Sequence, residues 1–267
     1  MNAAPEKTLA ELTARDALTA AQREEMFALL AAHFEGVTRA QFAGDLAEKN
    51  WVLRLTRDGR LVGFSTLLAY ETEFEGERLA VIYSGDTIVA PEAWGGMTLP
   101  RAWIAAVNRV RATLAPARCV WLLLTSGFRT YRFLPVFWRE FWPRCDAPTP
   151  VAPARLAAHL AREKFGGGFD AGSGIVRLPN PQRLRAGLNE VPAGRARDSH
   201  IAFFLARNPG HARGDELVCL TELTAENLTA AGRRMVCAPS GSRSAEHGSA
   251  GEKPVTTRAE QSSALRV

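Results

Sequence analysis

The chain has 267 residues, of which 46% are hydrophobic and 23% charged. This composition is typical of a globular domain with a sizeable buried core. The formal net charge is +5, but only four of the 33 basic residues are Lys, and this excess of Arg indicates a GC-rich genome. The basic residues form no cluster interleaved with aromatic residues, so a nucleic-acid partner is not expected.

The cysteines and the N-terminal segment exclude other classes. Cysteines stand at positions 119, 145, 219 and 237 without a CxxC pair, so neither a metal site nor a disulfide framework is expected. Residues 1–16 hold no apolar segment of the signal-peptide type. No apolar run approaches the roughly 20 residues that span a bilayer. We therefore expect a cytoplasmic protein with no metal and no membrane partner.

Two helices and then three strands are expected first. Thr19 with Gln22, and Thr38 with Gln41, have the spacing of a capping box. The apolar residues behind each pair recur at helical spacing, which predicts helices over about 19–35 and 38–50. Residues 51–56, 61–74 and 79–89 are then rich in strand-forming residues and are joined by the short links 58–59 and 75–76, which contain Gly. These three strands are expected to form an antiparallel meander.

A crossover is expected next. Residues 91–96 form a loop with Pro and Gly that opens a helix with Trp103, Val107 and Val110 on one face. The unbroken apolar run 119–124 is typical of a strand buried on both faces. Strand, helix and strand together predict a parallel, right-handed crossover. A helix over 128–142 is expected to follow, bent or shifted by its internal proline.

The remainder is less regular. Residues 146–198 are rich in Ala, Pro, Gly and Arg and are expected to form an insertion with a helix over 153–164. A last strand pair is predicted over 201–206 and 216–223, and a last helix over 224–234. Residues 238–267 lack large apolar side chains and are expected to be a disordered tail, so that residues 1–237 form one domain.

This order of elements resembles the GNAT superfamily of N-acetyltransferases. The segment 61–65, LVGFS, is similar to the third strand of that family, and the segment 88–92, IVAPE, to the end of its fourth strand. The resemblance covers about 18–145 and extends weakly to about 223. It implies an α/β (α+β) fold with a mixed, mainly antiparallel sheet flanked by helices, and with residues 146–198 inserted before the last strand pair.

The loop after the fourth strand departs from the family pattern Q/R-x-x-G-x-G/A. Residues 94–99, WGGMTL, carry Trp at the basic position and Met and Leu at the two standard glycines. The family loop turns its backbone N–H groups toward a pyrophosphate at a helix N-terminus. Gly95 and Gly96 remain compatible with such a turn, with Thr98 as an extra donor and Arg101 as the cation.

The resemblance also implies a chemistry. In GNAT enzymes an acyl thioester lies in a V-shaped gap between the fourth and fifth strands, and an amine attacks its carbonyl carbon. The reaction needs alignment, a donor for the oxyanion and a base for the amine proton. The resemblance places the gap between residues 83–89 and 120–125, with acetyl-CoA or another acyl-CoA as co-substrate. The residues implied in holding it are Thr87, Ile88, Val89, Trp94, Gly95, Gly96, Thr98, Arg101, Thr125, Ser126 and Arg129.

Four residues are candidates for catalysis. Tyr83 and Asp86 are candidate bases, but strand alternation puts them on opposite faces unless a bulge intervenes, for which Gly85 is suited. The structural alternatives are a core tyrosine for Tyr83 and a local backbone hydrogen bond for Asp86. Tyr131 lies about one turn before the general-acid Tyr of the family, and His211 lies in a turn between the last two predicted strands.

The leading hypothesis is an acyltransferase that moves an acetyl or longer acyl group to an amine of a small molecule or peptide. The donor is an acyl-CoA or, because the loop is altered, the thioester of an acyl carrier protein. The alternative hypothesis is a catalytically inactive GNAT-like binding or interaction module. The oligomeric state is left open.

Overall fold

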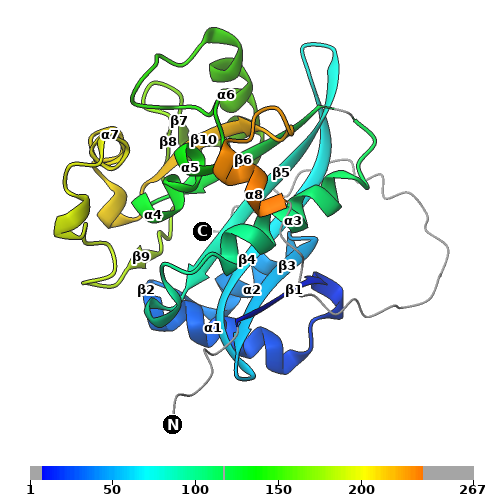
Figure 1. Ribbon diagram of the computed structural model, residues 1–267, viewed down its shortest axis with the longest axis vertical. Coiled ribbons are helices and arrows are strands. Elements are labelled where there is room, and N and C mark those ends of the chain that lie inside the picture. The colour runs from blue at the N-terminus through cyan, green and yellow to red at the C-terminus, as the bar shows by residue number, and fades with distance from the viewer. Residues whose placement is uncertain (1–7, 117, 237–267) are drawn as a thin grey trace.

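The computed structural model describes residues 8–116 and 118–236. Eight strands form one sheet in the order β1-β3-β4-β5-β6-β10-β8-β7, and helices lie on both of its faces (Figure 1). The strands are β1 (Leu9–Ala14), β3 (Trp51–Arg57), β4 (Arg60–Phe74), β5 (Glu77–Val89), β6 (Cys119–Thr125), β7 (Phe169–Asp170), β8 (Ile175–Val176) and β10 (Glu216–Glu222). The expected fold class, a mixed but mainly antiparallel sheet flanked by helices, is confirmed. The predicted tail and Cys237 lie outside the described residues.

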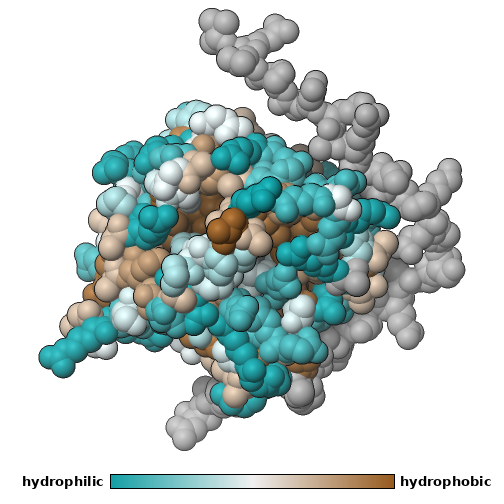
Figure 2. Space-filling model, turned by 90° about the horizontal axis from the view of Figure 1, so that it is seen from above, coloured by the Kyte–Doolittle hydropathy of each residue, from teal (hydrophilic) through white to brown (hydrophobic). Residues whose placement is uncertain are grey.

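Three buried clusters connect the helices to the sheet. One face of the sheet, called the α3 face, is covered by five helices. They are α3 (Thr98–Arg111), α4 (Phe128–Tyr131), α5 (Phe133–Phe137), α7 (Ser199–Arg207) and α8 (Ala230–Val236). The opposite face of the sheet, called the α6 face, is covered by α6 (Val151–Phe165) in one cluster and by α1 (Ala20–His33) with α2 (Arg39–Ala47) in another. On the surface seen in Figure 2, hydrophobic residues lie mostly in recesses between hydrophilic ones. Apolar side chains thus form a buried core on each face of the sheet.

The first two helices begin where the sequence indicates. The Thr19 hydroxyl accepts a hydrogen bond from the Gln22 backbone N–H, and the Gln22 side chain accepts one from the Thr19 N–H. This complete capping box satisfies two N–H groups that have no partner inside α1. Thr38 likewise accepts from the Gln41 N–H at the start of α2.

The predicted meander and crossover are confirmed. β3, β4 and β5 pair antiparallel in sequence. Their links, 58–59 and 75–76, hold two consecutive residues with φ between 51° and 81°, the backbone of the tightest hairpin turns. After α3 the chain returns as β6, which pairs parallel with β5 on one side and antiparallel with β10 on the other.

Three expectations were wrong. Residues 201–206 form part of helix α7 rather than a strand, because Ile201 and Phe204 both face the α3-face core and Asp198 caps the helix N-terminus. The helix expected over 128–142 is two short ones, and the chain beyond α5 is extended, with Trp142 bridging to Leu220 of β10. The last helix begins at Ala230 rather than near 224. In addition, β1 was not predicted.

Residues 146–198 wrap the sheet. α6 lies where a helix was expected, and β7 and β8 extend the sheet beyond β10. The chain then runs to the end of α1, where β9 (Arg183–Leu184) pairs with β2 (Phe34–Glu35). Residues 178–189, called the strap, therefore connect the β8 side of the sheet to the end of α1 (Figure 1).

The strap packs closely against two glycines from other segments. Gly36 has φ +80° and Gly214 has φ +92°. A Cβ atom at either position would lie within 3 Å of atoms of Pro181, so glycine serves both the left-handed backbone and the close approach. No helix in the described part of the chain has the length and apolar character of a membrane span.

Candidate functional site

Strands β5 and β6 separate part-way along their length. Their parallel pairing runs from Ala80 and Cys119 to Ser84 and Leu123, and ends there. β5 nevertheless continues to Val89 beside β4, and β6 continues to Thr125 beside β10. The facing backbone edges of these two strand ends are therefore not paired with each other, and their polar groups are available to a ligand.

A β-bulge accompanies this separation. The register between β4 and β5 passes from Leu67–Ser84 to Ser65–Thr87, so β5 contains one extra residue at Gly85 and Asp86. A bulge bends the strand and reverses the alternation of its side chains. The bulge expected at Gly85 is thereby confirmed.

The reversed alternation brings two candidates to one face. Tyr83 packs in the α6-face cluster before the bulge, and Ile88 packs with α1 and α2 on the same face after it. Asp86, two residues before Ile88, faces that side as well, toward Lys49, which follows α2. A Cβ atom at Gly85 would lie only 2.7 Å from Cε of Lys49 and from Oγ1 of Thr66, so this bulge requires glycine.

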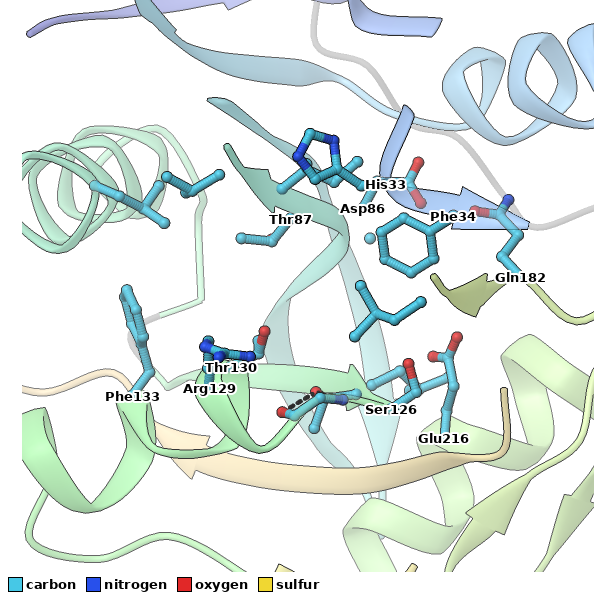
Figure 3. Close-up of a pocket in the computed structure, with 18 of the residues that line it drawn as sticks. His33, Phe34, Asp86, Thr87, Ser126, Arg129, Thr130, Phe133, Gln182 and Glu216 are labelled. Atoms are coloured by element: carbon cyan, nitrogen blue, oxygen red, sulfur yellow. Dashed lines mark hydrogen bonds between the residues drawn. The ribbon is translucent and has the colours of Figure 1, made fainter. Parts of the chain in front are cut away.

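A cavity of about 770 Å³ occupies the gap. It is lined on the α3 face by the loop after β5 and by α4, and on the α6 face by the ends of α2 and α6. The strap and residues 189–195 also line it, so the segment that was expected as an insertion contributes a wall. The cavity thus passes through the sheet between the separated strands (Figure 3).

On the α3 face the cavity meets a helix N-terminus. The chain leaves β5, turns at Gly95 with φ +81° and begins α3 at Thr98. Thr98 and Leu99, in the first turn of α3, line the cavity. Backbone N–H groups of a first turn have no partner inside the helix, and the helix dipole favours an anion there.

Trp94 and Arg129 stand together at this end. The Trp94 indole N–H donates to the carbonyl of Val89 at 2.7 Å, and the Arg129 guanidinium lies 4.0 Å from the Trp94 ring centroid. Arg129 also donates to the backbone carbonyl of Leu188 in the strap. Burial lowers the pKa of Arg129, and the charge of Arg195 adds to this. Among the described residues no carboxylate forms an ion pair with either arginine, so this end of the cavity is cationic.

On the α6 face the cavity holds carboxyl groups. Burial raises the pKa of Asp86 from 3.8 to about 6, partly opposed by the charge of Lys49. Burial also raises the pKa of Glu216 to about 7, and the charges of Asp86 and Asp45 add to the increase. Figure 3 shows Asp86 on β5 and Glu216 on β10, both pointing into the cavity. At neutral pH the Asp86 carboxylate is mostly ionised and able to accept a proton.

The structure brings together all but two of the candidates predicted from sequence. Those that line the cavity are Tyr83, Asp86, Thr87, Ile88, Val89, Trp94, Gly95, Gly96, Thr98, Thr125, Ser126, Arg129 and His211. The two outside it are Tyr131 and Arg101. Tyr131 is fully buried and its hydroxyl donates to the carbonyl of Pro143 at 3.0 Å, whereas Arg101 is exposed on α3.

His211 belongs to a 3-10 turn over His211–Arg213 rather than to a hairpin tip. Burial lowers its pKa below 6.5, while a hydrogen bond with the Ser126 backbone opposes that change. His211 is therefore mostly neutral at pH 7. In the described ranges no group of three or more His, Cys, Asp or Glu is placed to hold a metal ion.

Sequence reasoning missed Glu216, Lys49 and Arg195. Glu216 is the first residue of the apolar strand β10, and two-residue alternation puts it on the same face as the buried Val218 and Leu220. A carboxylate at such a position was the signal available in the sequence. Lys49 and Arg195 lie far from the gap in sequence, after α2 and after the strap, and carried no comparable local signal.

No family model and no curated protein matches this sequence. Among solved structures, the chain is similar to a GNAT-family N-acetyltransferase from Escherichia coli in complex with CoA, with 16% identity and a TM-score of 0.38 over 50% of this chain and 71% of that one. It is similar to an IAA acetyltransferase from Bacillus cereus, with 12% identity and a TM-score of 0.34 over 53% and 83% of the two chains. A conserved protein of unknown function from Enterococcus faecalis, described as a probable N-acyltransferase, has 12% identity and a TM-score of 0.38 over 81% of this chain and 66% of its own. Because these identities and TM-scores are low, the function proposed below rests on the chain's own residues.

Proposed function

We propose that the protein is an N-acyltransferase that transfers an acyl group from an acyl-CoA to an amine. The observation that carries this proposal is the separation of β5 and β6 at the Gly85 bulge, around a cavity that passes through the sheet. One end of the cavity is cationic and adjoins a helix N-terminus, and the other end holds carboxyl groups. This polarity suits a phosphate-bearing donor on the α3 face and a cationic amine on the α6 face.

The donor is held on the α3 face. Its phosphates lie near the N-terminus of α3, Arg129 and Arg195, which supply N–H dipoles and two guanidinium groups. Its thioester arm runs along the unpaired edge of β5 at Thr87, where backbone groups bind it as they would a neighbouring strand. The carbonyl of Val89 already accepts from Trp94, so this group is not available unless the indole moves.

The reaction takes place at the bulge. The amine nitrogen attacks the thioester carbonyl, a C–N bond forms, and the C–S bond breaks as the CoA thiolate leaves. Asp86 takes the proton that the amine loses, because its carboxylate faces the cavity and its pKa of about 6 lies near the working pH. A backbone N–H on the free edge of β5 stabilises the oxyanion. Tyr83 and His211 line the same space and position the acceptor.

Acyl-CoA is expected to raise the thermal midpoint of the protein. A ligand that binds only the folded state at 100 times its Kd stabilises by about 2.7 kcal/mol, which corresponds to several degrees for a domain of this size. Thermal unfolding with acetyl-, butyryl- and octanoyl-CoA tests this. If no chain length shifts the midpoint, while an acylated carrier protein does, the carrier thioester is the donor. If neither does, the inactive binding module is the better description.

Arg195→Ala is expected to weaken acyl-CoA binding about tenfold, because a charged hydrogen bond to phosphate contributes about 1.5 kcal/mol or more. Arg195 is exposed, so the change should leave stability nearly unaltered. Isothermal calorimetry gives the Kd. Arg101→Ala is the matched control, since Arg101 lies outside the cavity and its removal should not change the Kd. The reverse pattern, loss with Arg101→Ala and none with Arg195→Ala, would contradict this placement of the phosphates.

A further inference from the structure

The Tyr83 side chain borders the cavity near several charged groups. Tyr83 is only 8% exposed and lines the cavity on the α6 face. No side chain or backbone group of the described residues forms a hydrogen bond with its hydroxyl. Lys49 and Lys164 lie over its ring, with Nζ at 5.5 and 4.7 Å from the centroid. The Tyr83 hydroxyl can therefore form a hydrogen bond with a polar group of a ligand in the cavity.

The charges around Tyr83 are predominantly negative. Burial raises the pKa of Tyr83, and four carboxyl groups raise it further: those of Glu216 on β10, Asp86 on β5, Asp45 on α2 and Glu48 directly after α2. Against these four carboxyl groups stand two ammonium groups, those of Lys49 and Lys164. When all six groups are ionised, the α6-face end of the cavity has an excess of two negative charges.

Both lysine ammonium groups already have a partner within the protein. Lys164 Nζ lies 3.0 Å from a carboxylate oxygen of Glu48, and Lys49 Nζ donates to the backbone carbonyl of Asp45 at 2.8 Å. Among the described residues, Asp86 and Glu216 form no ion pair. Two histidines also line this cavity. His33 donates from Nδ1 to the carbonyl of Leu29 at 2.8 Å. Burial lowers the pKa of His211, so His211 supplies little positive charge near neutral pH.

Apolar side chains line the cavity near these carboxyl groups. Phe34, in β2 directly after α1, lines the cavity. Leu124 of β6, Phe165 of α6 and Leu178 of the strap line the same cavity. Such a lining favours methylene groups, which gain by leaving water, whereas the carboxyl groups favour ammonium groups.

From this arrangement we infer that the acceptor is a dication with an apolar linker, an α,ω-diamine in the simplest case. This inference rests on the proposed function and assigns its acceptor class. One amine lies at Asp86, where it loses its proton and is acylated. The second ammonium group remains charged near Glu216, within reach of the Tyr83 hydroxyl. A monoamine leaves one carboxylate buried and unpaired and therefore binds more weakly.

Calorimetric titration without any donor tests the inference. At pH 8, 1,4-diaminobutane or 1,5-diaminopentane is expected to bind at least about tenfold more tightly than n-butylamine, since a second charged hydrogen bond is worth this much. Binding should weaken toward pH 5.5, because protonation of Asp86 and Glu216 removes the charges that attract the ligand. Equal affinities for diamine and monoamine at pH 8 would overturn the inference.

The variant Glu216→Gln keeps the side-chain volume and removes one charge. It is expected to weaken diamine binding about tenfold and to leave n-butylamine binding unchanged. Glu222→Gln, an exposed carboxylate at the other end of β10 and outside the cavity, should change neither. If Glu216→Gln does not fold, the wild type tests the same carboxylate: its preference for the diamine over n-butylamine should fall as the pH is lowered through about 7, where Glu216 becomes protonated. A diamine preference that survives in the variant would overturn the assignment.

The acyl-CoA experiment decides the proposed function separately. Acyl-CoA binding without a diamine preference overturns only the acceptor class. A diamine preference without any donor binding overturns the transferase and leaves a dication-binding site.

Discussion

Asp86→Asn is expected to lower kcat by about 10²- to 10⁴-fold, the usual contribution of a positioned general base. Asn has nearly the same volume, so the bulge and the cavity should keep their shape. Steady-state kinetics with acyl-CoA and a diamine acceptor measure the effect. Asp58→Asn, in the exposed turn between β3 and β4, is the matched control and should keep full activity. An Asp86→Asn variant with normal turnover would exclude Asp86 as the base.

The pH dependence of the wild type and of Asp86→Asn tests the role of Asp86 in a second way. The wild-type kcat is expected to rise with pH through about 6, because the carboxylate of Asp86 must be unprotonated to accept the amine proton. Since the pKa of Asp86 is raised on folding, the folded protein holds this proton more tightly than the unfolded chain. The resulting stability is fully present below pH 4 and is lost as the pH rises through about 6. Asp86→Asn should therefore unfold at a higher temperature than the wild type at pH 8, and the difference should shrink in acid.

Gly85→Ala is expected to destabilise the protein by about 1 to 3 kcal/mol, the usual cost of overpacking. The new methyl group would lie 2.7 Å from Cε of Lys49 and from Oγ1 of Thr66, and Thr66 is a buried, short side chain that has little room to move. The strain falls on the residue next to Asp86, so kcat should also fall, by about 10²-fold if the carboxylate moves by 1 Å. Urea unfolding and steady-state kinetics measure the two effects.

Gly44→Ala is the control for Gly85→Ala. Gly44 lies within α2, and a Cβ atom there would meet nothing within 4 Å. Alanine at a helix position of this kind is expected to stabilise by about 0.5 to 1 kcal/mol. If Gly85→Ala is as stable and as active as the wild type, the bulge does not depend on glycine and does not position Asp86.

Local signals in the sequence sufficed for much of the fold. The capping residues Thr19 and Thr38, the two-residue hairpin links and the apolar run of β6 each act over a few neighbours, and each formed the expected element. The bulge was also predictable, because a glycine between two polar candidates on a long strand indicates an interrupted alternation. The strand edge and the loop residues of the candidate site were predicted from the resemblance of this order of elements to the GNAT superfamily.

The sequence by itself therefore determined the meander and the crossover, because these depend on hydrophobic periodicity and turn chemistry within short segments. The position of the gap was predicted from the resemblance to the GNAT superfamily. Only the tertiary structure decided what surrounds the gap. Residues 201–206 are apolar enough for a strand or a helix, and the Asp198 cap together with packing against the α3-face core selects the helix. Glu216 and Arg195 reach the cavity from segments more than 100 residues beyond Asp86. Their roles depend on long-range packing, and no local pattern specifies which distant charges meet.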